Sequence, residues 1–144
     1  MSLDTVYDPQ NIFAKIIRGE IPCVKLHETA DTLAFMDVFP QSEGHCLIIH
    51  KSATATNLFD IDGDALSSLS QSVQKIARAV KDRLKPDGVR IVQFNGAPAG
   101  QTVFHLHFHV IPIYEGVALG AHASGGPAAA EKLEPIAAKI RAAL

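Results

Sequence analysis

The chain has 144 residues, of which 47% are hydrophobic and 19% are charged, and its formal net charge is -2. This length and composition exclude a disordered chain and predict one globular domain, over residues 1–144, with a single hydrophobic core. Lys and Arg are scattered along the chain, so no basic stripe predicts a nucleic-acid partner. No apolar run approaches the roughly 18 residues that cross a membrane, so we expect no membrane partner.

The first ten residues and the two cysteines bear on the cellular compartment. Residues 1–10 are polar and carry Asp4 and Asp8, whereas a secretory signal peptide begins basic and then turns apolar. Cys23 and Cys46 form no CxxC motif and are too few for a disulfide framework. We therefore expect a cytoplasmic protein in which both thiols are reduced.

Short strands and helices follow one another along the chain. We predict a helix over 11–18, strands over 24–28, 32–36 and 45–50, a long helix over 64–85, strands over 89–95 and 103–113, and a last helix that begins at Pro127. The long helix has the strongest pattern, because apolar residues between Leu66 and Leu84 recur at steps of three and four. The glycine-rich segment 114–126 has no periodicity, and we expect it to be a loop in which His122 is solvated.

The most informative segment is residues 100–111, GQTVFHLHFHVI. In a strand, successive side chains point to opposite faces. One face would carry Val103, His105, His107, His109 and Ile111, and the other would carry Phe104, Leu106, Phe108 and Val110. The second face is apolar and is expected to pack against the helices. The first face would then present three imidazoles about 7 Å apart.

Three interpretations of the histidine row remain open from the residues alone. A single histidine on a strand face is usually solvated and idle, but three in strict alternation argue against this. A His-x-His pair can bind zinc, although the third histidine lies too far along the strand to reach the same ion, and no Asp, Glu or Cys is near in sequence. Acid–base or nucleophilic catalysis suits imidazole near neutral pH, and we favour it.

The loop before the histidines supports catalysis on a phosphate group. Gly96 and Gly100 bracket the segment GAPAG, and such glycines let the backbone N–H groups approach a bound anion. Gln101 and Thr102 add side-chain donors next to the first histidine. Alone, a glycine pair is a weak signal, but beside the histidines it predicts a phosphate site.

The segment 105–111, HLHFHVI, resembles the His-φ-His-φ-His-φ-φ signature of the histidine triad superfamily, where φ is hydrophobic. The preceding GQTV and the segments 11–22 (NIFAKIIRGEIP), 34–37 (AFMD) and 44–49 (GHCLII) are similar to further blocks of that family. The resemblance covers residues 11–113 and points to the histidine triad nucleotide-binding proteins, which are purine nucleoside phosphoramidases. It implies an α+β fold: a five-stranded antiparallel sheet with a long central helix and a C-terminal helix, paired into a homodimer.

The resemblance also implies a mechanism. His107 would attack the α-phosphorus of a purine nucleotide conjugate and form a nucleotidyl–histidine intermediate, which water then hydrolyses. The backbone carbonyl of His105 would accept a hydrogen bond from the other ring nitrogen of His107 and so fix its tautomer. His109 and the Thr102 hydroxyl would contact phosphate oxygens and the leaving group, and Gln101 would help to position them.

Further residues acquire roles from the resemblance. His45 would assist proton relay, Asn95 would contact the phosphate, Asp37 would accept the ribose hydroxyls, and Phe13, Phe35, Met36 and Val38 would enclose the base. From the residues alone, Asp37 suits a turn cap equally well, and the four apolar residues suit ordinary core.

Three positions depart from the family pattern. Asn11 and Ala14 stand where many bacterial members have the two cysteines of a zinc-binding CxxC, and Ala53 stands where a further histidine is expected. We therefore expect no structural zinc and no required cofactor. Two other functions share the same motifs: a dinucleoside polyphosphate hydrolase, and a nucleotide-binding regulatory module that works through a protein partner.

Overall fold

The computed structural model describes residues 3–120 and 126–144. The described residues form the elements α1 (Ile12–Ile17), β1 (Lys25–Glu28), β2 (Thr32–Met36), β3 (Cys46–His50), α2 (Gly63–Leu84), β4 (Gly88–Val92), the 3-10 turn η1 (Ala97–Ala99), β5 (His107–Ile113) and α3 (Ala130–Arg141). Within this part of the chain, no helix is both long and apolar enough to cross a membrane.

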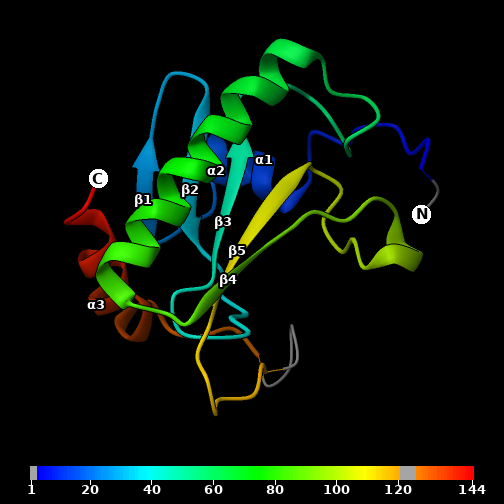
Figure 1. Cartoon of the computed structure of the whole chain (residues 1–144). Coiled ribbons are helices and arrows are strands. Elements are labelled where there is room, and N and C mark those ends of the chain that lie inside the picture. Colours follow the sequence, from blue (N-terminus) through cyan, green and yellow to red (C-terminus); the bar gives the residue numbers. More distant parts are fainter. Residues whose placement is uncertain (1–2, 121–125) are drawn as a thin grey trace.

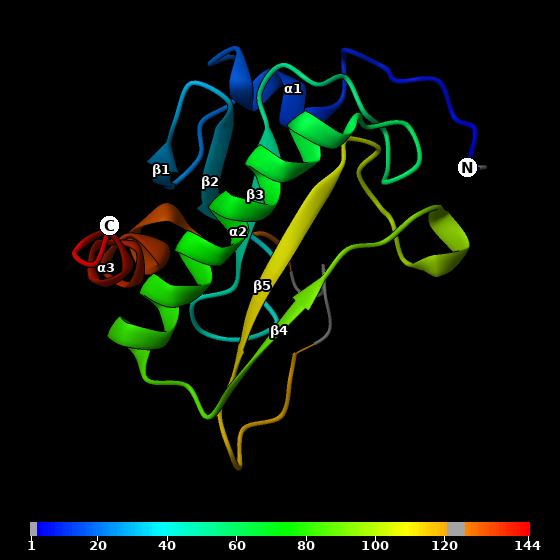
Figure 2. The same ribbon diagram turned by 45° about the horizontal axis from the view of Figure 1, so that its top comes forward.

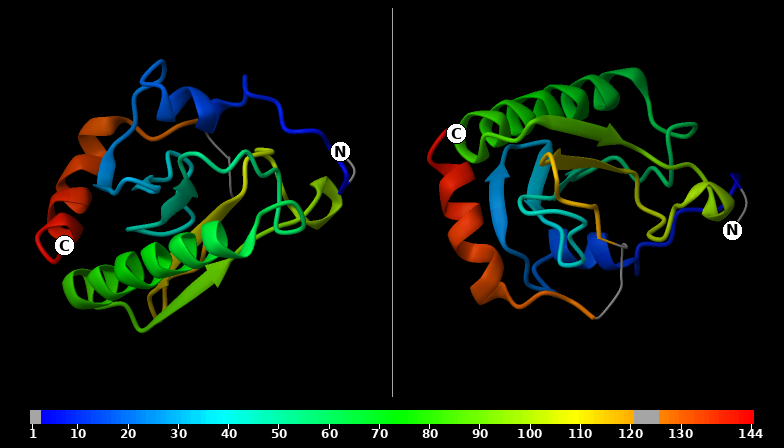
Figure 3. Two further views of the ribbon diagram at one scale, coloured as in Figure 1. Left: turned by 90° about the horizontal axis from the view of Figure 1, so that it is seen from above. Right: turned by 60° about the horizontal axis from the view of Figure 1, so that its bottom comes forward.

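The five strands form one sheet in the order β1-β2-β3-β5-β4, and every neighbouring pair is antiparallel. Figures 1 and 2 show the long helix α2 along one face of the sheet, with α3 beside it and β4 at the outer edge next to β5. Helix α1 lies on the opposite face (Figure 3). The predicted five-stranded α+β fold with a long helix and a C-terminal helix is confirmed.

Two apolar clusters hold the layers together, because alternate side chains of the strands point to opposite faces. The larger cluster joins α2 and α3 to residues such as Ile48 and Val110, which are fully buried. The smaller cluster lies on the α1 face and contains Phe13, Phe35 and Leu47. In the antiparallel register, Leu47 faces His109 and Ile49 faces His107, so both histidines project from the α1 face of the sheet.

The last strand is shorter than predicted, and residues 103–106 are not part of it. Its neighbours explain this: β3 ends at His50, and the pairing between β3 and β5 stops at His107. Before that point the Leu106 N–H instead donates to the carbonyl of Ala55 at 2.9 Å. The prediction that His105 lies on the same strand as His107 and His109 is therefore wrong.

Two other predicted boundaries differ by three residues. Strand β4 ends at Val92 rather than at residue 95, because its pairing with β5 stops at the Val92–His109 pair. Beyond that point the Gln93 side-chain amide donates to the Phe94 carbonyl and the Asn95 side chain. The last helix begins at Ala130 rather than at Pro127, and it contains Pro135.

Candidate active site

A pocket of about 380 Å³ lies between α1, the end of β2 and the start of β5. Its walls are mostly apolar, and His107, His109, Thr102 and Asp37 supply polar groups. All four predicted base-slot residues line it: Phe13, Phe35, Met36 and Val38. The pocket therefore brings the predicted base slot to the same place as two of the three triad histidines.

His107 is held in one tautomer by the backbone. Its Nδ1 lies 2.7 Å from the carbonyl oxygen of His105, and because a carbonyl only accepts, Nδ1 carries the proton. The lone pair of the neutral ring is then on Nε2, as a nucleophile requires. The ring is 6% exposed, and the Phe13 ring meets it edge-on at a centroid distance of 5.0 Å.

His109 and the buried His45 form a second hydrogen-bonded unit. The Gln41 N–H donates to Nδ1 of His45 at 3.0 Å, so the neutral ring of His45 carries its proton on Nε2. That nitrogen lies 2.9 Å from Nδ1 of His109 and 3.3 Å from an oxygen of Asp37. His109 must accept on Nδ1 and therefore holds its own proton on Nε2, where it can donate.

Asp37 is a turn cap at the wall of the pocket, and its contact with the ribose hydroxyls stays a prediction. It is only 3% exposed and lines the pocket. Its Oδ1 accepts the Phe39 N–H at 2.8 Å, as a turn cap does, while Oδ2 faces His45. Sequence reasoning missed Gln41, because its contribution to this cluster is a backbone N–H that any residue type except proline would supply.

His105 lies behind His107 and does not line the pocket. Its Nε2 is 3.2 Å from the carbonyl of His50, and its Nδ1 is 2.8 Å from the hydroxyl of Tyr7. Burial lowers the pKa of His105 to about 4, so the ring is neutral near pH 7. Tyr7 is a second residue that the sequence did not indicate.

The predicted phosphate loop, residues 96–100, is stabilised by hydrogen bonds of the buried Gln101 side chain. Gly96 and Gly100 both have positive φ, 87° and 110°, which favours glycine. The Gln101 amide accepts from Gly96 N–H at 2.8 Å and donates to the carbonyls of Thr56 and Val103. A direct donor to the phosphate would line the pocket, but Gln101 does not; its side chain holds the loop in shape instead. The exposed Thr102 does line the pocket.

Asn95 also lies outside the pocket lining. Its side-chain oxygen accepts from the Leu58 N–H at 2.9 Å and from the Gln93 amide at 2.8 Å. The predicted phosphate contact of Asn95 therefore remains a prediction, and His122 lies outside the described residues.

A model of the HIT domain matches residues 18–116 of the sequence. The chain belongs to the HIT family. Adenosine 5'-monophosphoramidase hnt1 of Schizosaccharomyces pombe is 42% identical over 101 residues, which cover 70% of this HIT protein and 72% of the yeast protein. The resemblance to the histidine triad superfamily is thereby confirmed, and the relatives support the predicted enzyme class, a nucleotide hydrolase.

Solved structures agree with this assignment. A Hit-like protein involved in cell-cycle regulation from Bartonella henselae superposes with a TM-score of 0.88 at 49% identity, covering 96% of this chain and 99% of that chain. A zinc-bound histidine triad family protein from Mycobacterium smegmatis superposes with a TM-score of 0.79 at 30% identity, covering 93% and 92%.

The family zinc motif has no counterpart in this HIT protein. Asn11 caps α1 by accepting the Ala14 N–H at 2.9 Å, and Ala14 is buried in the smaller core. Ala53 carries no ligand atom in its side chain and donates its N–H to His50. These positions serve the fold, so the residues present do not fit a structural zinc.

A second group of residues offers atoms that a metal ion could bind. Ligand atoms of Asp37, His45 and His109 lie within 4.8 Å of one another. Zinc would need the Nε2 lone pair of His45, but the Gln41 N–H already occupies the lone pair of Nδ1, so Nε2 bears the proton. The arrangement suits hydrogen-bond relay better than metal coordination.

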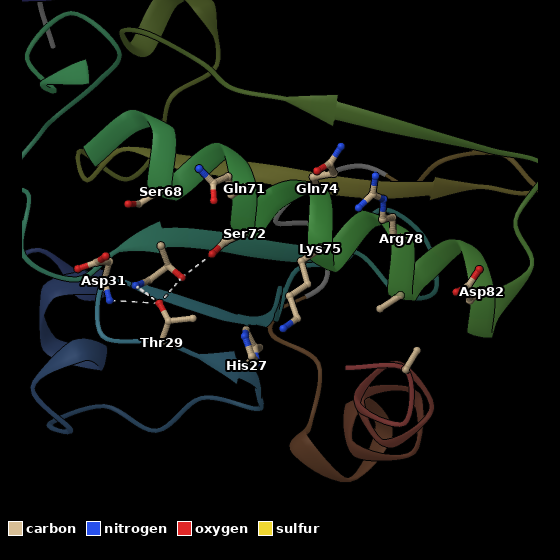
Figure 4. Close-up of a pocket in the computed structure, with 13 residues that line it drawn as sticks. His27, Thr29, Asp31, Ser68, Gln71, Ser72, Gln74, Lys75, Arg78 and Asp82 are labelled. Carbon is tan, nitrogen blue, oxygen red and sulfur yellow. Dashed lines mark hydrogen bonds between the residues drawn. The ribbon is translucent and has the colours of Figure 1, made fainter. Parts of the chain in front are cut away.

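A larger and more open hollow, of about 710 Å³, lies between the β1–β2 turn and α2 (Figure 4). Lys75 and Arg78 are accompanied there by Asp31 and Asp82, so the charges of the walls balance. Burial and the charge of Lys75 lower the pKa of His27. No predicted site residue lines this hollow.

Proposed function

We propose that this HIT protein is a nucleotidyl hydrolase that cleaves purine nucleoside 5'-phosphoramidates or similar AMP conjugates through an intermediate on His107. The observation that carries the proposal is the 2.7 Å contact between His107 Nδ1 and the His105 carbonyl. It leaves the nucleophilic lone pair on Nε2, in a pocket whose apolar walls suit a purine and which contains a carboxylate.

The first half-reaction uses two histidines in different roles. Nε2 of His107 attacks the α-phosphorus, and a phosphorus–nitrogen bond to the ring forms as the bond to the leaving amine breaks. The departing amine takes its proton from a solvent water molecule, while the Nε2–H of His109 donates a hydrogen bond to the reacting group. The 2.9 Å contact with His45 supports this role, because the His45 Nε2–H holds His109 in the tautomer that donates from Nε2.

The second half-reaction restores the proton balance. Water attacks the phosphorus and gives its proton to the hydroxide left in solvent by the first step, the bond to His107 breaks, and AMP leaves with His107 restored. Asp37 would accept the ribose hydroxyls, and its position at the pocket wall beside Phe35 supports this role. The Thr102 hydroxyl would donate to a phosphate oxygen.

The decisive variant is His107→Ala. Loss of the nucleophile should lower kcat for an AMP–amine conjugate about 10³-fold or more, while AMP still binds because the pocket walls remain. His27→Ala removes a histidine outside the pocket and should retain the wild-type rate. A His107→Ala rate equal to wild type would exclude the mechanism.

The same assay distinguishes the alternatives. A dinucleoside polyphosphate hydrolase would prefer a diadenosine polyphosphate to the AMP–amine conjugate. A regulatory module would hydrolyse both slowly and bind a protein partner tightly. Because we propose that no metal is required, the rate should persist after dialysis against EDTA.

We propose that the protein acts as a homodimer in the cytoplasm. The outward edge of β4 supports the dimer, because β4 ends the sheet and Ile91 on it is 46% exposed, and an open edge of this kind pairs readily with another strand. The free thiols of Cys23 and Cys46 suit a reducing compartment.

A further inference from the structure

Residues 3–8 form neither helix nor strand but run as an N-terminal arm across the loop that contains residues 55–57. Alternate residues of this N-terminal arm are fastened to the protein by hydrogen bonds. The bonds are from Asn57 Nδ2 to the Leu3 carbonyl at 2.9 Å, from Thr56 Oγ1 to the Thr5 carbonyl at 3.1 Å, and between the Tyr7 hydroxyl and His105 Nδ1 at 2.8 Å.

The bond at Tyr7 has a defined direction. The His50 carbonyl lies 3.2 Å from Nε2 of His105 and can only accept, so the proton of the neutral ring is on Nε2. Nδ1 then carries the lone pair, and the Tyr7 hydroxyl donates to it. The half-buried Tyr7 and the backbone of His50 together hold both nitrogens of the His105 ring.

His105 depends on these contacts for its position. It precedes β5, so no ladder bond of the sheet fixes it among the described residues. Its carbonyl nevertheless has to stay 2.7 Å from Nδ1 of His107 to keep the proton there. Because the ring is bonded at both nitrogens, it restrains the Cα of His105 and thereby the carbonyl next to it.

We propose that Tyr7 is a positioning residue for the triad: it anchors the His105 ring and thereby fixes the carbonyl that orients His107. The inference rests on the proposed role of His107 as the nucleophile. It adds the N-terminal arm, which lies outside the segment matched by the HIT-domain model, to the machinery that prepares the nucleophile.

The loop that holds the N-terminal arm is also bonded to the rest of the site. The Thr56 carbonyl accepts from the Gln101 amide at 2.7 Å, and the Ala55 carbonyl accepts from the Leu106 N–H at 2.9 Å. The N-terminal arm, the phosphate loop and the triad segment are therefore all hydrogen-bonded to the loop of residues 55–57. Loosening the arm should disturb orientation at His107 more than it disturbs the base slot.

Tyr7→Phe tests the proposal, because it removes one hydroxyl and keeps the ring that packs 5.5 Å from the His105 ring. We expect kcat for an AMP–amine conjugate to fall about three- to tenfold, the range expected for one hydrogen bond, with KM changed less than twofold. Tyr114→Phe is the matched control, since its hydroxyl donates to the Glu43 carbonyl at 2.8 Å outside the triad. It should retain the wild-type kcat.

Nitrogen NMR of the histidine rings gives a readout that does not depend on turnover. In Tyr7→Phe the Nδ1 resonance of His105 should shift, because that nitrogen loses its donor, and the fraction of His107 protonated on Nδ1 should fall. Tyr114→Phe should leave both signals unchanged. These signals also separate the two proposals, because they test the anchor even if the wild-type protein fails to cleave the conjugate.

Thr56→Val provides a second variant that leaves Tyr7 and the triad intact. It removes only the hydroxyl bonded to the Thr5 carbonyl, so it should loosen the N-terminal arm and lower kcat in the same direction but by less. The proposal is overturned if folded Tyr7→Phe keeps kcat within twofold of Tyr114→Phe and the His105 signal does not move.

Discussion

His107 and His45 each present one ring nitrogen to the backbone, His107 to the carbonyl of His105 and His45 to the N–H of Gln41. A carbonyl and an N–H impose opposite tautomers, so one ring offers a lone pair and the other a proton on Nε2. The two ring states, a lone pair on Nε2 in His107 and a proton on Nε2 in His45, are thus set by the backbone groups behind the rings rather than by different side chains.

Gln101 offers a prediction at the same scale. Its amide, 2% exposed, makes three hydrogen bonds that close the phosphate loop. Gln101→Ala strands a buried N–H and two carbonyls, and we expect it to lower the free energy of unfolding by about 2–4 kcal/mol. Urea denaturation checks this.

Gln93→Ala is the control for that measurement. Gln93 also makes two amide hydrogen bonds, but it is only half-buried, so water can replace them. We expect a loss below about 1 kcal/mol. Equal losses for the two variants would contradict the bracing role of Gln101.

Single residues also mark how far the sequence predicts this site. His107 and His109 follow from alternation, because both lie on β5 and point to the face of the sheet that bears α1. His105 does not, because its conformation is set by Tyr7 and His50, which are distant along the chain. Gln41 leaves no sequence signal at all, since its contribution is made by the backbone.

At the scale of elements, β4 stands out because it is an edge strand with exposed side chains. It closes one edge of the sheet, and Arg90 and Ile91 are exposed on it. Edge strands with exposed apolar residues tend to pair unless a charge prevents it. The proposed homodimer would use this edge to continue the sheet into a second copy.

Ile91→Lys tests that arrangement. Sedimentation at low micromolar concentration should show a dimer for the wild-type protein and a monomer for the variant, because the new charge would be desolvated on pairing. Lys132→Glu changes an exposed charge on α3, beside the opposite edge of the sheet, and should remain dimeric. A dimer that survives Ile91→Lys would place the interface elsewhere.

The sequence also predicts the bounds of helices and strands with unequal accuracy. The pattern of α2 is self-contained, and the observed helix, Gly63–Leu84, differs from the predicted one by a single residue at each end. The boundaries of β4 and β5 were less accurate, because a strand ends where its neighbour turns away, and no local pattern records that event.

For the molecule as a whole, burial of His105 predicts acid sensitivity. Its pKa is about 4 in the folded protein against 6.5 for an ordinary histidine, so the unfolded chain binds a proton more readily between these values. Folding stability is therefore fully present above about pH 6.5 and declines as the pH falls toward 4. The contribution of this one group is about 3 kcal/mol.

Denaturation of the wild-type protein and of His105→Gln at pH 7 and pH 4 measures this contribution. The variant should be less stable at pH 7 but should lose less on acidification, and the difference between the two losses should be about 3 kcal/mol. Glu28, whose pKa is lowered to about 2 by Lys25 and Lys51, affects both proteins equally. Parallel losses would contradict the assignment to His105.

The sheet separates two regions that can be altered for different purposes. Apart from Met36, the buried residues of the cluster under α2 and α3 do not line the pocket, so repacking Ile48 or Val110 should change thermal resistance without changing which base is accepted. The cluster under α1 supplies both core and pocket wall through Phe13, Phe35 and Leu47. A redesign of base specificity would have to change these residues, and each change would also lower the free energy of unfolding because the same side chains form core.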